Sequence, residues 1–337
     1  MMTNWITQFN DVEDADTHLS GGTAYVANNM VADFASSIGF KKLHYKNFLN
    51  LENAELRCKE LAEGMLSAVQ SDDVVVVQFP LWTNKTFDLA FFEELEKKKC
   101  KKIAFIHDIQ SYMGNYNKDT DHFLNLLRRF DIIIAHNQKM IAKLQGDDVN
   151  VPMISMHLFD FPAKSPISPR KFEKKIFWIG MGIGMPHVSL DSYRGKTPWY
   201  IYTAAKKISH GDNVKIHDLV PAEELTHILD GGFGLLELQP IRWVDYGAIN
   251  NPFKLSQYIS LGLPVIVSSR IAHAEWIKEQ KIGFVVDDFN EIDAIVDNMT
   301  EEDYNEILEN IKPWQKAVHS GYFAKHALFE ALKLTKG

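Results

Sequence analysis

Short apolar runs alternate with helical patterns along most of the chain. Several runs are apolar at nearly every position, which is typical of strands buried on both faces of a sheet. In the first half, such strands are predicted at Val74–Phe79, Ile103–His107 and Asp131–His136. Apolar residues at helical spacing lie around 27–38 and 61–69. Because parallel strands need crossover connections, this alternation predicts a parallel sheet covered by helices.

The alternation is interrupted once and then restarts. Residues Phe161–Arg170 contain three prolines, which remove backbone donors, so we interpret this segment as an interdomain linker. After it, strands are predicted at Ile176–Gly180, Val214–His217, Phe233–Leu238, Pro264–Ser268 and Phe284–Val286, and helices at Ala222–Leu229, Pro252–Leu261, Ala272–Glu279, Glu291–Met299 and Gly321–Leu334.

The chain of 337 residues is longer than one hydrophobic core usually serves. We therefore predict an α/β protein with two Rossmann-like domains facing across a cleft. The first domain takes residues 1–160 together with 316–337, whose helix packs back onto it, and the second takes residues 171–315. Ligands of open α/β sheets bind at the carboxyl ends of the strands, so the cleft is the expected active site.

Composition and charge exclude several classes of protein. The net charge of -8 argues against a nucleic-acid partner, which would need a broadly basic face. We find no apolar stretch near the roughly 20 residues of a membrane-spanning helix, and no signal-peptide pattern at the N-terminus. Cys58 and Cys100 are the two cysteines, and such a small number is typical of a protein from a reducing compartment. We expect a cytoplasmic enzyme or binding protein.

The sharpest local signal is the segment Asn250–Ser256. Asn251 is a favoured N-cap and Pro252 a favoured first helical residue, which places Lys254 in the first helical turn. A cation there is opposed by the helix dipole by roughly 0.3–1 kcal/mol, whereas a bound anion would make it favourable. Two interpretations stay open: a phosphate or diphosphate site, or a lysine that reaches water or pairs with a carboxylate such as Asp245.

Two glycine-rich turns are further candidates for anion binding. Ser20-Gly21-Gly22-Thr23 precedes a helix, where Thr23 can cap the helix or contact a phosphate, although an ordinary turn has the same pattern. The turn that starts at Gly180 fails the dinucleotide fingerprint because Met185 occupies its last position. No complete P-loop motif occurs in the chain.

His107 and Asp108 end a predicted strand and are expected to project into the cleft. A histidine titrating near neutral pH can deprotonate an acceptor hydroxyl, with a carboxylate to orient or replace it. The alternative is a histidine that only hydrogen-bonds the backbone at a strand end. Asp14-x-Asp16 and Asp119-x-Asp121 do not follow strands, and no cysteine or histidine cluster has metal-ligand spacing, so we expect no metal.

Three motifs together resemble a known family. They are Gly231-Gly232-Phe233-Gly234-Leu235-Leu236, Asn250-Asn251-Pro252-Phe253-Lys254-Leu255-Ser256-Gln257-Tyr258 and Gly262-Leu263-Pro264-Val265-Ile266-Val267. The chain resembles bacterial GT-B glycosyltransferases of two related types. One type adds the second sugar, glucose, to serine-rich repeat adhesins, and the other is the β-1,6-galactofuranosyltransferase of polysaccharide assembly. The similarity extends from about residue 74 onward.

The resemblance implies a GT-B fold and a hexosyltransferase that uses a UDP-sugar, with UDP-glucose favoured. The acceptor would be a glycan or a GlcNAc-modified serine-rich repeat adhesin, with no cofactor and no metal, and the family often self-associates. The residues it implies for donor binding are Thr23, Gly180, Asn250, Asn251, Phe253, Lys254, Leu255 and Ser256.

Some positions depart from the family. The arginine expected after the first strand of the second domain has no counterpart in Gly180–Met185, and Leu219 stands where a tyrosine is common. Glu237 and Asp245 have the spacing of the Glu-x7-Glu motif of retaining enzymes but not its identity. We therefore expect inversion with a base in the first domain. The alternatives are a non-catalytic GT-B scaffold for a partner transferase and a nicotinamide oxidoreductase.

Overall fold

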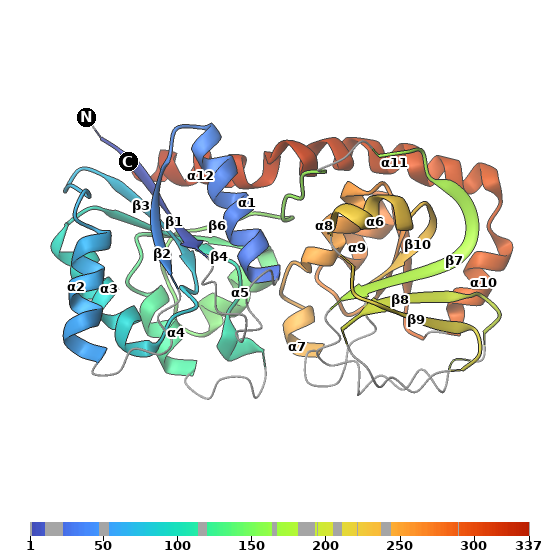
Figure 1. Ribbon diagram of the computed structural model, residues 1–337, viewed down its shortest axis with the longest axis horizontal. Coiled ribbons are helices and arrows are strands. Elements are labelled where there is room, and N and C mark those ends of the chain that lie inside the picture. Colours follow the sequence, from blue (N-terminus) through green and yellow to red (C-terminus); the bar gives the residue numbers. More distant parts are fainter. Residues whose placement is uncertain are drawn as a thin grey trace. The chain divides into compact units, whose positions relative to one another are not determined.

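The chain folds into two compact units, seen in the computed structural model of Figure 1. The structure describes residues 2–10, 23–46, 54–113, 120–163, 167–180, 193, 195–204, 211–220, 222–236, 244–288 and 290–336. The first unit comprises Met1–Phe159 and Gly321–Gly337, and the second comprises Asp160–Ser320. The last helix of the chain thus belongs to the first unit.

The first unit is built on a six-stranded parallel sheet. Across the sheet the strands are β2 (Lys41–Lys46), β1 (Asn4–Asn10), β3 (Val74–Phe79), β4 (Lys101–Ile106), β5 (Ile132–Ala135) and β6 (Met153–Ser155). Its α-helices are α1 (Thr23–Ser37), α2 (Ala54–Met65), α3 (Lys85–Lys97), α4 (Thr120–Leu127), α5 (Gln138–Gly146) and α12 (Tyr322–Leu334), and a short 3₁₀ helix spans Gln110–Tyr112. Every side chain of β3 and β5 is buried.

Helices cover both faces of this sheet. Right-handed crossovers place α1 on the face opposite α2 and α3, because the chain reverses its direction across the sheet after β2. Helices α2 and α3 pack on each other, and α12 packs on α1 and β5 (Figure 1). Gly321 starts α12 with φ +73°, and a Cβ there would lie 2.2 Å from the ring of Phe34 on α1. This close approach requires glycine at the entry of the helix.

The second unit repeats the architecture with a different strand order. Its parallel strands are β12 (Gly283–Val286), β11 (Val265–Ser268), β10 (Gly231–Leu235), β7 (Lys171–Gly180), β8 (Trp199–Thr203) and β9 (Val214–Asp218). Its helices are α6 (Ala222–Ile228), α7 (Val244–Gly247), α8 (Phe253–Ser260), α9 (Ala274–Glu279), α10 (Glu291–Asn298) and α11 (Glu301–Ser320). The alternation predicted from the sequence is confirmed. Four strands (β1, β2, β6 and β8) and five helices (α3, α4, α5, α7 and α11) were not individually predicted.

The segment predicted as a linker is part of the second unit. The N–H of Phe161 donates to Val318 O at 3.0 Å on α11. Arg170, only 7% exposed, donates to the carbonyls of Leu261 (2.6 Å), Thr226 (3.3 Å) and Leu229. The second unit therefore begins at Asp160 rather than at 171, and it runs to Ser320 rather than to 315. Prolines limit hydrogen bonding within this segment, but they do not prevent it from packing against a core.

Arg170 is therefore predicted to stabilise the second unit. Replacing it by methionine leaves buried carbonyls without donors, at a cost of about 1–3 kcal/mol. Urea unfolding should show a lower midpoint for Arg170→Met at an unchanged slope. The matched control is Arg128→Met, because Arg128 is more exposed and also donates to backbone carbonyls, those of Asp147 and Asp148. Equal midpoint shifts in the two variants would contradict the assignment.

Candidate functional site

In the second unit, the candidate site lies at the N-terminus of α8. Pro252 is the N-cap, with ψ 120°, so the helix begins at Phe253. Asn251, predicted as the N-cap, precedes it and is buried, and the prediction was wrong by one residue because the proline keeps an extended conformation. Lys254 is nevertheless in the first helical turn, as predicted.

Helix α8 is fixed against the sheet by its fully buried tyrosine. The hydroxyl of Tyr258 lies 3.3 Å from Phe177 O on β7 and 3.4 Å from Leu235 O on β10. A Cβ at Gly234 would lie 2.6 Å from the Tyr258 ring, so this glycine lets the helix approach β10. The glycine-rich motif before the helix therefore has a packing role, and it sets the position of Lys254.

Lys254 extends over an aromatic ring at the end of β7. Its Nζ lies 4.0 Å from the centroid of the Trp178 ring. Such a cation–π contact contributes about 0.5–2 kcal/mol. It can offset the penalty of roughly 0.3–1 kcal/mol for a cation at a helix N-terminus. One contact of this lysine is thus with an indole, and the carboxylate partner that the sequence suggested as an alternative stays a prediction.

Gly180 is the last residue of β7 and lies beside this pair. A Cβ at this position would be 3.1 Å from Lys254 Nζ and 2.8 Å from the Trp178 ring. Glycine therefore leaves the space in which the ammonium and the indole meet. Strand β7 has β8 on one side and β10 on the other, so the chain reverses its winding direction at this strand. Open α/β sheets bind ligands at the carboxyl ends of the strands at such a point.

The remaining predicted donor-binding residues of the second unit differ in exposure. Asn250 and Phe253 are half-buried, and Phe253 packs on Phe161 with ring centroids 5.4 Å apart. The side chain of Leu255 is in the core, so it can contribute to donor binding only through its backbone. The Ser256 hydroxyl and the Trp178 indole N–H are buried, and neither has a hydrogen-bond partner among the described residues.

His107 and Asp108 lie in the first unit, directly after β4. His107 was expected to project into the cleft, whereas its side chain is buried within the first unit and only 4% exposed. Its ring lies parallel to that of Phe159, with centroids 5.8 Å apart, and Nε2 is 2.7 Å from Gln78 Oε1. Burial, and to a lesser extent the neighbouring His136, lowers the pKa of His107 to about 3. Asp108 is half-buried.

Other predicted positions are only partly described. Thr23, expected just before the helix, is instead the first residue of α1, and its side chain lies outside the described part. The loop after Gly180, the motif at Asp14-x-Asp16, Asp119 and Glu237 also lie outside it. Within the described residues, no group of three or more histidine, cysteine or acidic side chains has the arrangement of a metal site.

Two residues of interest were not predicted from the sequence. Trp178 lies in the buried part of β7, where an aromatic residue suggests only a core position. Gln78 interrupts the valine run of β3 and is fully buried. A buried amide in an otherwise apolar strand was a usable signal, because such a group requires hydrogen-bond partners.

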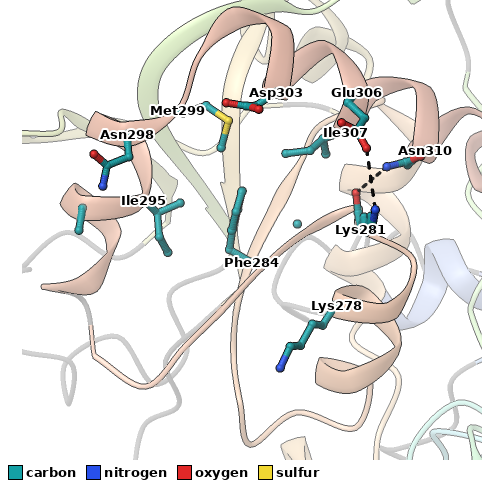
Figure 2. Close-up of a pocket in the computed structure, with 12 residues that line it drawn as sticks. Lys278, Lys281, Phe284, Ile295, Asn298, Met299, Asp303, Glu306, Ile307 and Asn310 are labelled. Carbon is teal, nitrogen blue, oxygen red and sulfur yellow. Dashed lines mark hydrogen bonds and ion pairs between the residues drawn. The ribbon is translucent and has the colours of Figure 1, made fainter.

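A separate cavity of about 660 Å³ opens in the second unit between α9, β12, α10 and α11. Figure 2 shows Phe284, Ile295 and Ile307 around it, with Lys278 and Asp303 among the polar residues that line it. The twelve residues drawn include none of the predicted donor-binding residues. None of the described helices is both long enough and apolar enough to span a membrane.

Comparison with known proteins identifies relatives over most of the chain. Residues 3–158 match the family described as Glucosyltransferase 3-like, N-terminal domain, and residues 183–331 match the corresponding C-terminal domain. Glucosyltransferase 3 of Streptococcus gordonii is 30% identical over 317 residues, covering 92% of this chain and 94% of the relative. The β-1,6-galactofuranosyltransferase WbbI of Escherichia coli K12 is 27% identical over 276 residues, covering 79% and 81%.

The fold is similar to that of solved glycosyltransferases. An E. coli trehalose-6-phosphate protein bound with UDP-2-fluoro glucose superimposes with a TM-score of 0.64, covering 97% of this chain and 98% of that one. At 11% identity this likeness concerns the fold alone. The two parallel six-stranded sheets with their helices are those of the GT-B fold, as predicted.

The burial of His107 predicts a pH dependence of stability. The pKa of a histidine in an unfolded chain is about 6.5, whereas the pKa of His107 in the folded protein is about 3. Between these values the unfolded chain binds a proton that the folded chain does not, so this site removes stability as the pH falls, by up to ~1.4 kcal/mol per pH unit. Urea unfolding at about pH 7 and about pH 5 should therefore show a smaller loss for His107→Gln than for wild type.

The control for this comparison is His44→Gln, which changes an exposed histidine on β2 and leaves the buried site intact. If His107→Gln lost as much stability as wild type over the same interval, the buried neutral state of His107 would be refuted.

Proposed function

The chain belongs to the glucosyltransferase 3-like family of glycosyltransferases, and from this premise we propose that it transfers a hexose from a UDP-sugar to a hydroxyl of a sugar acceptor. The favoured donor is UDP-glucose. The favoured acceptor is a glycan or a GlcNAc-modified serine-rich repeat adhesin. Support for the donor comes from the glucosyltransferase relative and from the UDP-2-fluoro glucose bound by the structural neighbour.

The observation that carries this proposal is the cation at the start of α8. Transfer from a UDP-sugar leaves a diphosphate whose negative charge must be stabilised. The Lys254 ammonium and the N-terminus of α8 both favour an anion, and Gly180 keeps open the space beside them at the end of β7. We propose that they bind the diphosphate and make a metal ion unnecessary.

Other residues of the second unit complete the proposed donor site. Phe253 is the first residue of the helix, and Asn250 and Asn251 precede its N-cap. The buried hydroxyl of Ser256 lies within the next turn. An oxygen of the bound UDP-sugar would give this hydroxyl a hydrogen-bond partner, which lowers the free energy of the bound state. Thr23, at the start of α1 in the first unit, remains a proposed contact carried over from the family.

The pKa of His107 favours a particular division of roles in the first unit. A general base is most effective when its pKa is near the working pH. The pKa of His107, about 3, makes its ring a hydrogen-bond acceptor rather than a strong base. We therefore propose that His107 orients the attacking hydroxyl and that the carboxylate of Asp108 takes its proton, with inversion at the sugar.

The transferase proposal predicts a measurable product. A panel of UDP-glucose, UDP-N-acetylglucosamine and UDP-galactofuranose should be incubated with a GlcNAc-modified serine-rich peptide and the products read by mass. We expect a hexose mass increment with UDP-glucose, in a reaction that chelators do not inhibit. Transfer from UDP-galactofuranose alone would favour the function of the WbbI relative. No transfer and no donor hydrolysis would favour a non-catalytic scaffold.

The assignment of Lys254 predicts a specific loss of donor binding. Lys254→Ala should weaken UDP binding at least about tenfold, because it removes a charge-assisted contact worth about 1.4 kcal/mol or more, and it should largely abolish transfer. Calorimetry with UDP measures the first effect. Lys278→Ala is the matched control, because Lys278 lines the separate cavity of Figure 2. We expect the Lys278→Ala protein to bind UDP with wild-type affinity. An unchanged UDP affinity in Lys254→Ala would refute the assigned site.

A further inference from the structure

One buried amide of the first unit joins β1 and β3 to the residue that follows β4. Gln78 on β3 is completely buried, and its backbone N–H donates to Thr7 Oγ1 on β1 at 2.8 Å. Its side-chain Nε2 donates to the backbone oxygen of Thr7 at 2.6 Å. Its Oε1 lies 2.7 Å from Nε2 of His107, directly after β4. The amide therefore has one fixed partner on each side.

These partners determine which nitrogen of His107 carries the proton. A backbone oxygen can only accept a hydrogen bond, so the NH₂ end of Gln78 must face Thr7 and the oxygen end must face His107. An amide oxygen also only accepts, so Nε2 of His107 must donate. In the neutral ring the other nitrogen, Nδ1, then has a free lone pair.

The Nδ1 atom is buried and has no hydrogen-bond partner among the described residues. The ring contacts two aromatic neighbours: it lies parallel to the ring of Phe159, and its centroid is 5.4 Å from that of Phe105. A buried acceptor without a donor destabilises the unliganded protein, and a bound hydroxyl would relieve that cost. The low pKa of His107 keeps the ring neutral, so Nδ1 remains an acceptor at neutral pH.

The topology places this group at a ligand-binding position. Strands β1 and β3 are neighbours, and the chain builds outward from β1 in one direction and from β3 in the other. This is the reversal point of the first sheet, and open α/β sheets bind ligands at the carboxyl ends of the strands there. Gln78 is the penultimate residue of β3 and His107 follows the last residue of β4, so both lie at that edge.

We propose that Gln78, anchored by Thr7, is a positioning residue that fixes His107 as the Nε2–H tautomer and so presents Nδ1 to a hydroxyl of a bound sugar. This inference rests on the proposed function, because a glycosyltransferase supplies that ligand. No covalent step is involved. Gln78 acts on the substrate only through the ring of His107.

The tautomer can be measured directly in the full-length protein by NMR with ¹⁵N-labelled histidine, and the His107→Gln spectrum identifies the signals of His107. We expect a proton on Nε2 and none on Nδ1 in wild type. In Gln78→Leu the lost acceptor should yield a mixture of both tautomers, with kcat about tenfold lower and UDP affinity unchanged. The control Thr7→Val removes only the hydroxyl, so the backbone oxygen still holds the amide and the wild-type tautomer should persist.

Separate titrations then identify the source of the hydroxyl. UDP-glucose and the GlcNAc-modified peptide are added singly to labelled wild type, and the ligand that supplies the hydroxyl should shift the Nδ1 signal. A proton on Nδ1 in wild type, a wild-type tautomer in Gln78→Leu, or an Nδ1 signal that neither ligand moves would each overturn the proposal. A wild-type Nε2–H tautomer without transfer from any UDP-sugar would refute the proposed function and leave the tautomer assignment standing.

Discussion

Both sheets depend on one constraint of parallel strands. A parallel sheet that starts at an internal strand must grow outward in two directions, and its crossover helices then fall on opposite faces. At the point of reversal, no crossover connects the two neighbouring strands directly, so the carboxyl ends of both strands stay open. In the first unit these are β1 and β3, and in the second they are β7 and β10. Each unit carries its polar candidates at this point.

The two reversal points differ in their chemistry. In the second unit the end of β7 provides a glycine and an indole, and α8 adds an ammonium. This combination suits an anion. In the first unit the end of β3 provides an amide that orders a neutral imidazole, which suits an uncharged hydroxyl. The division fits a reaction between a charged donor and an uncharged acceptor.

The sequence predicts local features better than contacts between distant segments. The Asn-Pro pair placed Lys254 in a first helical turn because capping preferences are local. It did not predict Trp178 beside that lysine, because the contact joins β7 to a helix far along the chain. Strand β1 was missed because Thr7 and Gln8 interrupt its apolar pattern, although both are buried. His107 was placed correctly at a strand end, but its burial depends on Phe159 and Gln78, which the tertiary fold brings together.

The return of the chain at Gly321 has a consequence for biosynthesis. Helix α12 packs on α1 and β5, so the first unit is assembled from one segment that precedes the second unit in the sequence and one that follows it. Until α12 has emerged from the ribosome, the apolar surface that it covers on the first unit stays open to solvent or to chaperones. The second unit is contiguous and can fold as soon as α11 has emerged. The part of the protein that is translated first is thus completed last.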